Sequence, residues 1–488
     1  MYHHIKRFPN RKHLSDTNLI KHTLKNLPVT TLTLLLAVSL LLASCDEMVT
    51  GSDNSGASQI GLTDPPEESA SASIESIAIE DLGVIEGRTF HEARAINQLG
   101  EITGISKTME PPSLSSFFLW KEAGGLTNAG RYDGSTSGTV APHAINSSGQ
   151  IAGENYPYAV IWSPAGGFQM LGEEAAAFGL NDEGVAVGTR SWPIEGPELP
   201  RLGTQAVQWT EDGEMVILET FSERMDHPVE RNWNQAHDIN SAGDVVGYSI
   251  YPENNVSGPR RAVIWRDGDI AVDLGTLGGH SEALAINDQR QVVGQSVSDE
   301  VSSAEKEIYF VIDEARGEIL KRDGYDRLEA EFSPISSAAK TSAEGSDQNF
   351  QTSFKQMGSS GEPAYQVVAN SERAFIWDEQ NGMVSLGTHE GGPSIATDIN
   401  NKGQVVGYIL LPATDTETNR ARGFYWDEHN GMILLEPLDE SYTFSFAYSI
   451  NDDGVIVGRS STGQPGEMRA VKWKLTFEGE EPGLIASE

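Results

Sequence analysis

The chain has 488 residues, 50 of them glycine, and a formal net charge of −37. Residues 1–44 hold six of the 34 Lys and Arg but only one of the 71 Asp and Glu, so the remainder carries a net −42. So acidic a body argues against nucleic acid and against electrostatic docking on anionic lipid, since both need a cationic face. A single cysteine, Cys45, excludes an intramolecular disulfide and any cysteine-based zinc or iron–sulfur site.

The first segment has the pattern of an export signal. Lys21 and Lys25 precede an apolar core at 29–43, whose 15 residues are too short to span a bilayer comfortably. Leu42-Ala43-Ser44-Cys45 then resembles a bacterial lipobox, which implies cleavage before Cys45 and acylation of its thiol. We therefore expect a lipoprotein-type signal peptide at 1–44, with an ordinary signal peptide as the alternative.

Residues 45–73 are rich in Ser, Gly, Pro and acidic side chains and poor in apolar ones. Such a segment cannot bury enough surface to fold, so it is predicted to be a flexible tether. About 28 residues of flexible coil reach roughly 30 Å on average. The expected location is the cell envelope, with the protein anchored by lipid at the outer membrane, the cell surface or the periplasmic face. Full secretion is the alternative.

The body of the chain repeats one short pattern seven times. An apolar run ends in Asn, a Gly follows three residues later, and a second Gly follows four residues after that. Asn at the first position of a type I turn can bond the backbone two residues on, and Gly at the fourth adopts the left-handed conformation without steric cost. Each copy therefore predicts a β-hairpin, and its second Gly indicates a bulge or a close backbone approach.

The seven turn asparagines are Asn97, Asn146, Asn181, Asn240, Asn287, Asn400 and Asn451. The turn glycines are Gly100, Gly149, Gly184, Gly243, Gly403 and Gly454. The copy at Asn287 has Arg290 in place of the glycine, so a strained left-handed residue or a different turn is expected there.

A third, aromatic strand follows each hairpin and is marked by Trp120, Trp162, Trp209, Trp265, Trp377, Trp426 and Trp473. Four copies carry an arginine four residues before the tryptophan: Arg261, Arg373, Arg422 and Arg469. We expect these arginines to cap strands or to pair with neighbouring carboxylates. A ligand-binding set of arginines is the alternative.

A short Gly turn leads to a fourth strand in six copies, whereas the last copy stops at its third strand. A matching fourth strand lies at the other end of the body, at 77–83. The sequence therefore predicts an all-β fold at 74–478: a seven-bladed β-propeller of four-stranded antiparallel blades, closed by an N-terminal strand that completes the last blade. A β-helix is the alternative. Residues 479–488 form a short acidic tail.

The longest connection between a second and a third strand is an insertion at about 298–372. Within it, 307–323 has the pattern of a strand, a turn and a strand, and a Ser- and Gly-rich stretch follows. A hidden eighth blade is the alternative, although the insertion contains neither the Asn turn nor the Trp strand. The long connections all lie on one face of the predicted propeller, which we expect to be the binding face.

Taken together, Ile-Asn-x-x-Gly-x-Val-Val-Gly, x-Ala-Phe-x-Trp and Gly-Gly-Met-x-x-Leu-Gly resemble the repeats of the bacterial HAF-repeat family of extracellular proteins. The resemblance covers about 77–473. The histidine of the family's His-Ala-Phe is replaced here by arginine. The resemblance implies a secreted or surface repeat protein and carries over no catalytic residue.

No sequence motif for catalysis, a metal or a cofactor is present, so none of these is expected. His91, His280 and His389 are placed in loops before the hairpins, and His143 and His237 on first strands. The expected function is non-catalytic: a monomeric body that binds or scaffolds a protein or glycan partner outside the cytoplasm. The alternatives are an extracytoplasmic glycan hydrolase or lyase with its site on the variable-loop face, and a passive surface-coat or spacer protein.

Overall fold

The computed structural model describes residues 73–478 except for 109–113, 133–139, 195–200, 222–232, 254–255, 267–270, 301–307, 314–317, 324–364, 370, 414–417, 443 and 465. The predicted signal peptide, Cys45, most of the tether and the acidic tail lie outside the described residues. Within those residues the chain forms β-strands and no α-helix.

Each predicted hairpin supplies the first two strands of an antiparallel run of four strands. Five runs are separate four-stranded sheets. The other two form an eight-stranded sheet, in which they are joined by one parallel pair, Phe90 with Met468. We number the runs 1 to 7 in chain order of their hairpins.

The first strands of the runs are β2 (Phe90–Ile96), β6 (Val140–Ile145), β10 (Ala175–Leu180), β14 (Gln235–Ile239), β18 (Gly278–Ile286), β25 (Ser394–Ile399) and β29 (Ser445–Ile450). The second strands are β3 (Ile102–Lys107), β7 (Ile151–Asn155), β11 (Ala186–Ile194), β15 (Val245–Glu253), β19 (Val292–Ser298), β26 (Val405–Leu411) and β30 (Val455–Ser461). The third strands are β4 (Ser115–Lys121), β8 (Tyr158–Ser163), β12 (Arg201–Trp209), β16 (Val256–Trp265), β23 (Glu372–Asp378), β27 (Arg420–Asp427) and β31 (Met468–Phe477).

The fourth strands of runs 1 to 6 are β5 (Gly125–Gly130), β9 (Gly167–Glu173), β13 (Met215–Ile217), β17 (Val272–Asp273), β24 (Gly382–Gly387) and β28 (Gly431–Leu435). In run 7 the fourth strand is β1 (Ile74–Asp81), which comes from the start of the body and pairs antiparallel with β31. This pairing of the first strand with the last agrees with the sequence pattern.

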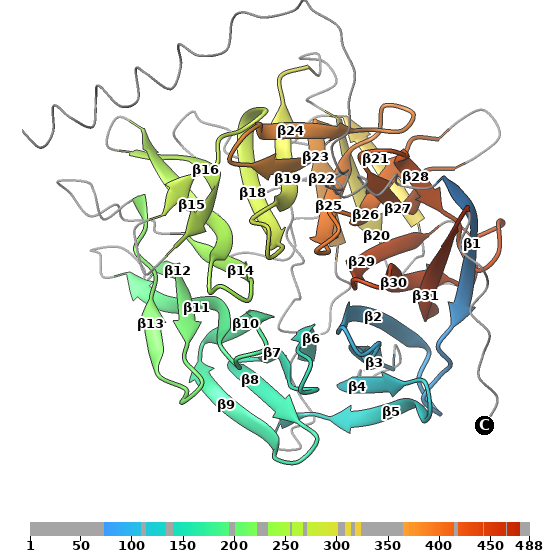
Figure 1. Ribbon diagram of the computed structural model, residues 1–488, viewed down its shortest axis with the longest axis horizontal. Helices are drawn as coiled ribbons and strands as arrows, with labels where there is room; N and C mark the ends of the chain where they lie inside the picture. Colours follow the sequence, from blue (N-terminus) through green and yellow to red (C-terminus); the bar gives the residue numbers. More distant parts are fainter. Residues whose placement is uncertain are drawn as a thin grey trace, which may run out of the picture. The chain divides into compact units, whose positions relative to one another are not determined.

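The runs lie side by side around a common centre, with their first strands innermost (Figure 1). Each first strand lies against the first strand of the next run, and β29 of run 7 lies against β2 of run 1. Apolar clusters fill the space between neighbouring runs. One cluster joins Ala93, Phe118 and Trp120 of run 1 to Val457 and Ala470 of run 7. Both faces of most sheets are therefore buried, which explains the apolar residues at consecutive positions.

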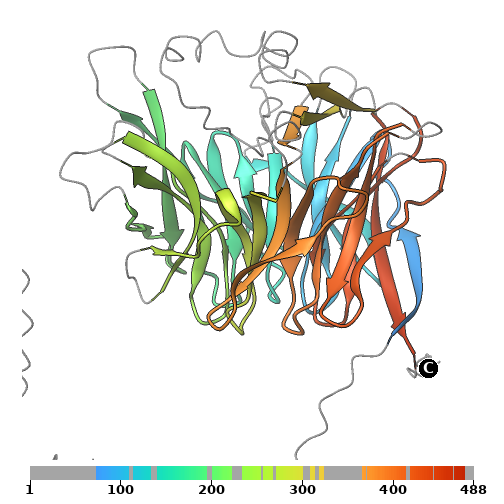
Figure 2. The ribbon, with the colours of Figure 1, turned by 90° about the horizontal axis from the view of Figure 1, so that it is seen from above.

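The insertion forms a small separate sheet in the order β21 (Glu318–Asp323), β20 (Ile308–Asp313), β22 (Tyr365–Ala369). The predicted strand, turn and strand correspond to β20 and β21, which pair antiparallel. The third strand, β22, was missed because it follows a Ser- and Gly-rich stretch with no turn signal. Figure 2 shows this sheet at one end of the ring of sheets.

The asparagine turns have the predicted geometry. In the run 6 turn, Asn400 Oδ1 accepts hydrogen bonds from the backbone N–H groups of Lys402 and Gln404, at 3.0 Å each. Gly403 has φ +74°, and Arg290, which replaces the turn glycine in run 5, has φ +63°. The backbone N–H of Arg290 donates to the Asn287 carbonyl, as that of Gly403 does to the Asn400 carbonyl. The Arg290 side chain pairs with Asp244 of run 4 at 2.6 Å.

The same asparagines also join the runs to one another. Each side-chain amide donates a hydrogen bond to the backbone carbonyl of the asparagine in the next run, and Asn451 donates to Asn97. The seven distances lie between 2.9 Å for Asn97 and 3.5 Å for Asn181. In five copies the amide also donates to a side chain four residues on, such as Gln404 at 2.7 Å from Asn400. The asparagine therefore closes its own turn and links two runs.

The second glycine of each repeat and a bulge in the first strand occur together. In run 1, a Cβ on Gly104 would lie 2.0 Å from the Glu92 carbonyl oxygen, so only glycine permits this approach. The pairing register shifts between Ala93 and Ala95, which leaves Arg94 as the extra residue. The same shift recurs opposite the second glycine in all seven hairpins.

Three runs carry a further link two residues before the asparagine. Asp238 accepts the backbone N–H of Ile286 in run 5, and Asp398 accepts that of Ile450 in run 7, both at 2.9 Å. Ser449 accepts that of Ile96 in run 1 at 3.4 Å. Burial raises the pKa of Asp398 to about 6 and that of Asp238 to about 7, against the hydrogen bonds they accept.

We expect Asn400→Asp to destabilise the fold by roughly 1–3 kcal/mol. The carboxylate keeps the oxygen that closes the turn but loses both donors, which leaves the Asn451 carbonyl without its partner. Chemical denaturation at neutral pH measures the loss. Asn128→Asp is the matched control, because Asn128 is exposed and acts as an acceptor for Gly130 N–H. Equal stability of Asn400→Asp and the wild type would contradict a structural role for the inter-run bond.

Asp398→Asn is expected to change how stability depends on pH. The folded pKa of Asp398 is about 6, above its ordinary value. At a pH low enough to protonate this carboxyl in both the folded and the unfolded state, its burial therefore does not reduce the stability of the fold. The cost grows as pH rises from about 4 to about 7, because only the unfolded carboxyl then ionises freely. Relative to that of the wild type, the free energy of unfolding of Asp398→Asn should therefore increase by about 1–3 kcal/mol over this pH range.

Denaturation midpoints at pH 4.5 and 7.5 measure this gain. The exposed Asp273, changed to Asn, is the control and should show no such trend. A difference between Asp398→Asn and the wild type that stays constant with pH would refute the raised pKa.

Candidate functional site

The bulged residues form a distinctive set on the innermost strands. All seven are half-buried, whereas the residue immediately before each of them is fully buried. A bulge turns its extra side chain away from the regular sheet faces. Because these strands surround the common centre, the bulged side chains keep their access to solvent there. They are Arg94, His143, Phe178, His237, Leu284, Thr397 and Tyr448.

The insertion covers part of this set. Phe310 and Ile312 of β20 are fully buried in an apolar cluster that includes Phe446 and Tyr408, and Leu284 and Tyr448 pack against the same cluster. Phe178 does not belong to that cluster, and Arg94, His143 and His237 lie on the neighbouring first strands β2, β6 and β14. These four residues, on the consecutive strands β2, β6, β10 and β14, are called the arc below.

The side chains at the centre of the arc contact one another. The ring centroids of His143 and Phe178 are 5.0 Å apart with an edge-to-face geometry, and those of Phe178 and His237 are 5.7 Å apart and stacked. Burial, together with the charge of Arg94, lowers the pKa of His143 to about 3, so its imidazole is neutral at physiological pH. Its Nε2 is buried and has no hydrogen-bond partner among the described residues. Such an orphaned polar atom needs water or a ligand.

At one end of the arc, Arg94 faces a buried carboxylate. Glu92 Oε1 lies 2.6 Å from Arg94 Nε, and Glu92 Oε2 lies 2.6 Å from Arg459 Nη1 of run 7. Although burial favours the neutral acid, Arg94, Arg459 and Lys107 hold the pKa of Glu92 below its usual range. Arg459 is itself buried, with its guanidinium 4.5 Å from the ring centroid of Phe446. Removing one partner of such a pair would leave a buried charge uncompensated.

At the other end, His237 Nε2 lies 3.0 Å from Oε1 of Glu282. Glu282 occupies the same repeat position as Glu92, five residues before the asparagine. Its Oε2 contacts Arg260 Nη1 at 3.2 Å and Gln295 Nε2 at 3.3 Å. Burial opposes ionisation, but Arg260 and His237 keep the pKa of Glu282 below its usual range.

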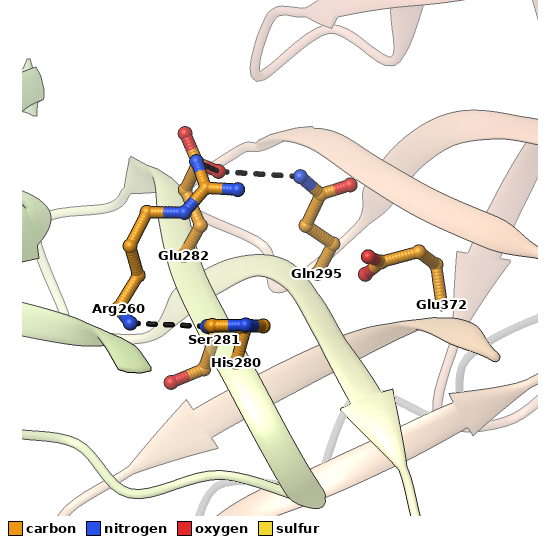
Figure 3. Close-up of a pocket in the computed structure, with 6 residues that line it drawn as sticks. All are labelled: Arg260, His280, Ser281, Glu282, Gln295 and Glu372. Atoms are coloured by element: carbon orange, nitrogen blue, oxygen red, sulfur yellow. Dashed lines mark hydrogen bonds and ion pairs between the residues drawn. The ribbon is translucent and has the colours of Figure 1, made fainter. Parts of the chain in front are cut away.

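This second carboxylate lies in a narrow gap between runs 4 and 5 that has no room for a water-sized sphere (Figure 3). The pocket is lined by Arg260, His280, Ser281, Glu282, Gln295 and Glu372. The Arg260 backbone N–H donates to His280 Nδ1 at 3.1 Å, which ties β16 to β18. Burial, together with Arg260, lowers the pKa of His280 to about 4. Two carboxylates in one pocket are compatible with acid–base chemistry, but the Arg260 side chain occupies the space between runs.

Glu154 on β7 adds a titratable group near the arc. Burial raises its pKa to about 7, with Arg94 opposing the rise. The region therefore combines a cation, a neutral imidazole, an aromatic ring and a carboxyl that is half protonated near neutrality. Such a set can bind a polar ligand with an apolar face.

The turn and strand residues lie in the elements that the sequence predicts for them. The asparagines and glycines form the turns. The tryptophans lie on the third strands, fully or half-buried. Two of the indole N–H groups donate to backbone carbonyls of the preceding run, Trp265 to Glu219 at 2.6 Å and Trp473 to Glu436 at 2.9 Å.

The four predicted arginines make local contacts. Arg261 donates to the Gly279 carbonyl at 2.6 Å, and Arg373 to the Glu372 carbonyl at 2.8 Å. Arg422 donates to the Tyr442 carbonyl at 3.2 Å, and Arg469 pairs with Glu467 at 2.9 Å and with Asp81 at 3.4 Å. These contacts are of the capping and pairing kind, and they differ from run to run.

Two histidine placements were wrong. His91 lies within β2 and His280 within β18, because these first strands begin earlier than the turn pattern suggested; His389 does lie in a loop. Burial lowers the pKa of His91 to about 4, and its Nε2 accepts the Ile85 N–H at 3.0 Å. A structural role therefore fits His91 and His280.

A second recess, on the side of the asparagine turns, is larger, at about 180 Å³. It is lined by residues of runs 2 and 3, among them Gln150, Asp182 and Glu211. Within the described residues, His, Cys, Asp and Glu form no group of three suited to a metal ion. Nor does any helix in that part of the chain have the length and apolarity needed to cross a membrane.

Sequence reasoning missed the arc. The position three residues before the asparagine was visible in all seven copies, and it varies among Arg, His, Phe, Leu, Thr and Tyr, whereas the residue before it is Ala in six copies and Pro142 in the other. This variability was the available signal. The bulge that turns these side chains inward was attributed to the second glycine on the partner strand.

No protein-family model and no curated protein matches the chain. Among solved structures, it is similar to the uncomplexed acylaminoacyl peptidase of Pyrococcus horikoshii, with a TM-score of 0.44 and 9% identity, over 80% of this chain and 53% of that one. The chain thus spans about half the length of that peptidase.

It is also similar to the β-propeller domain of the Trilobed protease from Pyrococcus furiosus, described as having an open velcro topology. That TM-score is 0.41, with 9% identity over 83% of this chain and 100% of the other. At these identities the similarity concerns the type of fold and not the activity. The chain is therefore an all-β protein of many four-stranded antiparallel sheets, with β-propellers among the structures that it resembles.

Proposed function

We propose that the chain is an exported, lipid-anchored, closed seven-bladed β-propeller that binds a glycan at the arc without chemical turnover. In this proposal, residues 1–44 are the signal peptide, 45–73 the tether, 74–478 the propeller with its insertion at about 298–372, and 479–488 a tail. Membership of the HAF-repeat family is part of the same proposal.

Closure is supported by the contacts between runs 7 and 1. Asn451 donates to the Asn97 carbonyl at 3.3 Å, which completes the cycle of asparagine bonds. Arg459 of run 7 pairs with Glu92 of run 1, and Lys472 lies 4.4 Å from the ring centroid of Trp120. The fourth strand of run 7, supplied by β1, would lock the ring.

Glycan binding rests on one observation, the arc. Phe178 presents a half-exposed ring between two imidazoles, which suits the apolar face of a pyranose, and the neutral His143 offers a hydrogen-bonding nitrogen to a hydroxyl. Binding sites commonly combine an apolar surface with a few placed polar groups. The second strands end on the side where the first strands begin, so the long connections that follow them in the sequence would frame the entry.

A hydrolase or lyase remains the second candidate, favoured by the two carboxylates in the pocket of Figure 3. Glu282 is held ionised by Arg260 and His237, so it would serve as a base or nucleophile. The passive spacer has no specific observation in its favour, because a spacer does not need half-exposed charged and aromatic side chains on its innermost strands.

The anchor is tested by Cys45→Ser. Without the thiol no acyl chain can be attached, so the variant should move from the membrane fraction to the soluble fraction. Immunoblots of separated fractions measure this. Ser44→Ala keeps the cysteine and is the matched control. Membrane association of Cys45→Ser equal to that of the wild type would remove the lipid anchor from the proposal.

The arc is tested by capture. Full-length protein on beads is incubated with envelope glycans and envelope proteins from the producing cell. Wild type should retain glycan, and Phe178→Ala should bind it roughly 5- to 30-fold more weakly, since a stacked aromatic contact of about 1–2 kcal/mol corresponds to that range of affinity.

Arg266→Gln is the control for this capture, because Arg266, which follows the third strand of run 4, pairs with the exposed Glu379 of run 5, away from the arc. Retention of protein alone would replace the glycan with a protein partner. A glycan shortened during incubation would favour the hydrolase. Capture unaffected by Phe178→Ala would move the site away from the arc.

A further inference from the structure

The charge at the Arg94 end of the arc differs from that of the chain as a whole. Glu92 is the buried acid there, and the three cations that hold its pKa down are Arg94, Arg459 and Lys107. These four groups sum to two positive charges, in a chain whose net charge is −37. The Glu282 end is different, because Arg260 is the one cation that lines a pocket with two acids, Glu282 and Glu372. The arc therefore has a positive end at Arg94.

Arg94 has hydrogen-bonding capacity beyond its ion pair. Its Nε lies against Glu92 Oε1, and Glu92 is the one partner that the described part of the chain gives it. A guanidinium carries five N–H donors in a planar fork, so both Nη groups remain for an anion. The fork matches the two oxygens of a carboxylate.

The neighbouring residue on the arc extends this site. The strands β2 and β6, which carry Arg94 and His143, lie against each other, and the charge of Arg94 is among the causes that lower the pKa of His143. A neutral imidazole beside a cation can donate to or accept from a hydroxyl without adding charge. The Nε2 of His143 is buried without a partner within the described residues. Phe178 follows at 5.0 Å from the His143 ring and supplies the apolar surface.

We propose that the arc recognises an acidic sugar, a uronic acid residue whose carboxylate binds Arg94, whose hydroxyls bond His143 and whose ring face lies on Phe178. This inference rests on the proposed glycan binding and narrows its ligand. The order of the three side chains along β2, β6 and β10 fixes the order of the three contacts.

Isothermal titration of the full-length protein tests the inference. The probes are oligomers of glucuronate, galacturonate and mannuronate, each beside its methyl ester, and a sulfated neutral oligosaccharide. A charged hydrogen-bonded contact of 1.5–3 kcal/mol corresponds to about 10- to 100-fold in affinity. At least one acid should therefore bind at least about tenfold more tightly than its own ester.

Arg94→Gln should abolish the preference for acid over ester, and the fold should survive because Glu92 keeps Arg459 at 2.6 Å. Arg266→Gln makes the same change of charge away from the arc and should keep the preference. Phe178→Ala should weaken acid and ester alike. A thermal melt of each variant checks folding.

Three outcomes would overturn the inference: acid and ester binding equally, the sulfated sugar binding more tightly than every acid, or an acid preference that survives Arg94→Gln. If Phe178→Ala still removes capture of a neutral glycan, the arc remains a glycan site and only the acidic ligand is lost. If no probe binds and envelope glycan is not captured either, the proposed function fails with it.

Discussion

The hydrogen bond from each turn asparagine to the carbonyl of the next is the interaction on which the arrangement of the sheets depends. A turn needs only the side-chain oxygen, which an aspartate would supply equally well. The link between runs needs the amide N–H, and only asparagine has both groups at this length. This double use explains why all seven copies have Asn although Asp is common elsewhere in so acidic a chain. The bond of Asn451 to Asn97 joins residues 354 apart in sequence.

The bulge opposite the second glycine connects the fold to the site. At Gly104 the partner carbonyl comes so close that no side chain is tolerated, and the first strand gains one residue there. That residue, Arg94 in run 1, leaves the sheet packing and keeps its access to solvent. The requirements on the two positions are opposite. The glycine is fixed because a Cβ there would lie 2.0 Å from the Glu92 carbonyl oxygen, whereas the bulged position holds six different residue types in the seven runs. The side chain at the bulge can therefore vary from run to run without changing the hairpin.

Much of the fold was predictable because it is local and repeated. Asn400, Gly403 and Trp426 recur at fixed spacing, and turn chemistry alone predicts their hairpin and strand. The pairing of β1 with β31 followed from counting strands. Three features were not predictable. β22 has no repeat to compare with, the start of β18 depends on contacts of His280 with run 4, and the links between runs depend on which runs are neighbours.

The candidate site was less predictable for a physical reason. Glu92 and Glu282 occupy equivalent positions, yet their partners come from different runs and different strands: Arg459 from β30 for the first, Arg260 from β16 for the second. A buried carboxylate needs compensating charge, but sequence spacing does not say which arginine supplies it. The four arginines before the tryptophans were visible as a pattern, and for that reason they were considered as a binding set. In the structure three of them donate to nearby backbone carbonyls, and Arg469 pairs with Glu467 and Asp81.

The strand directions show at which end of the body the first strands begin. β31 runs from Met468, beside the start of β2, to Phe477, which pairs with Ile74. The proposed tether would thus join the body at the asparagine-turn end, and the first strands would begin at the far end. The second strands end at that far end, and the insertion sheet lies there too, where β20 packs on Leu284 and Tyr448. If the chain is anchored as proposed, the tether would leave the body at the asparagine-turn end and would not need to cross the opposite end, from which a glycan would reach Arg94, His143 and Phe178.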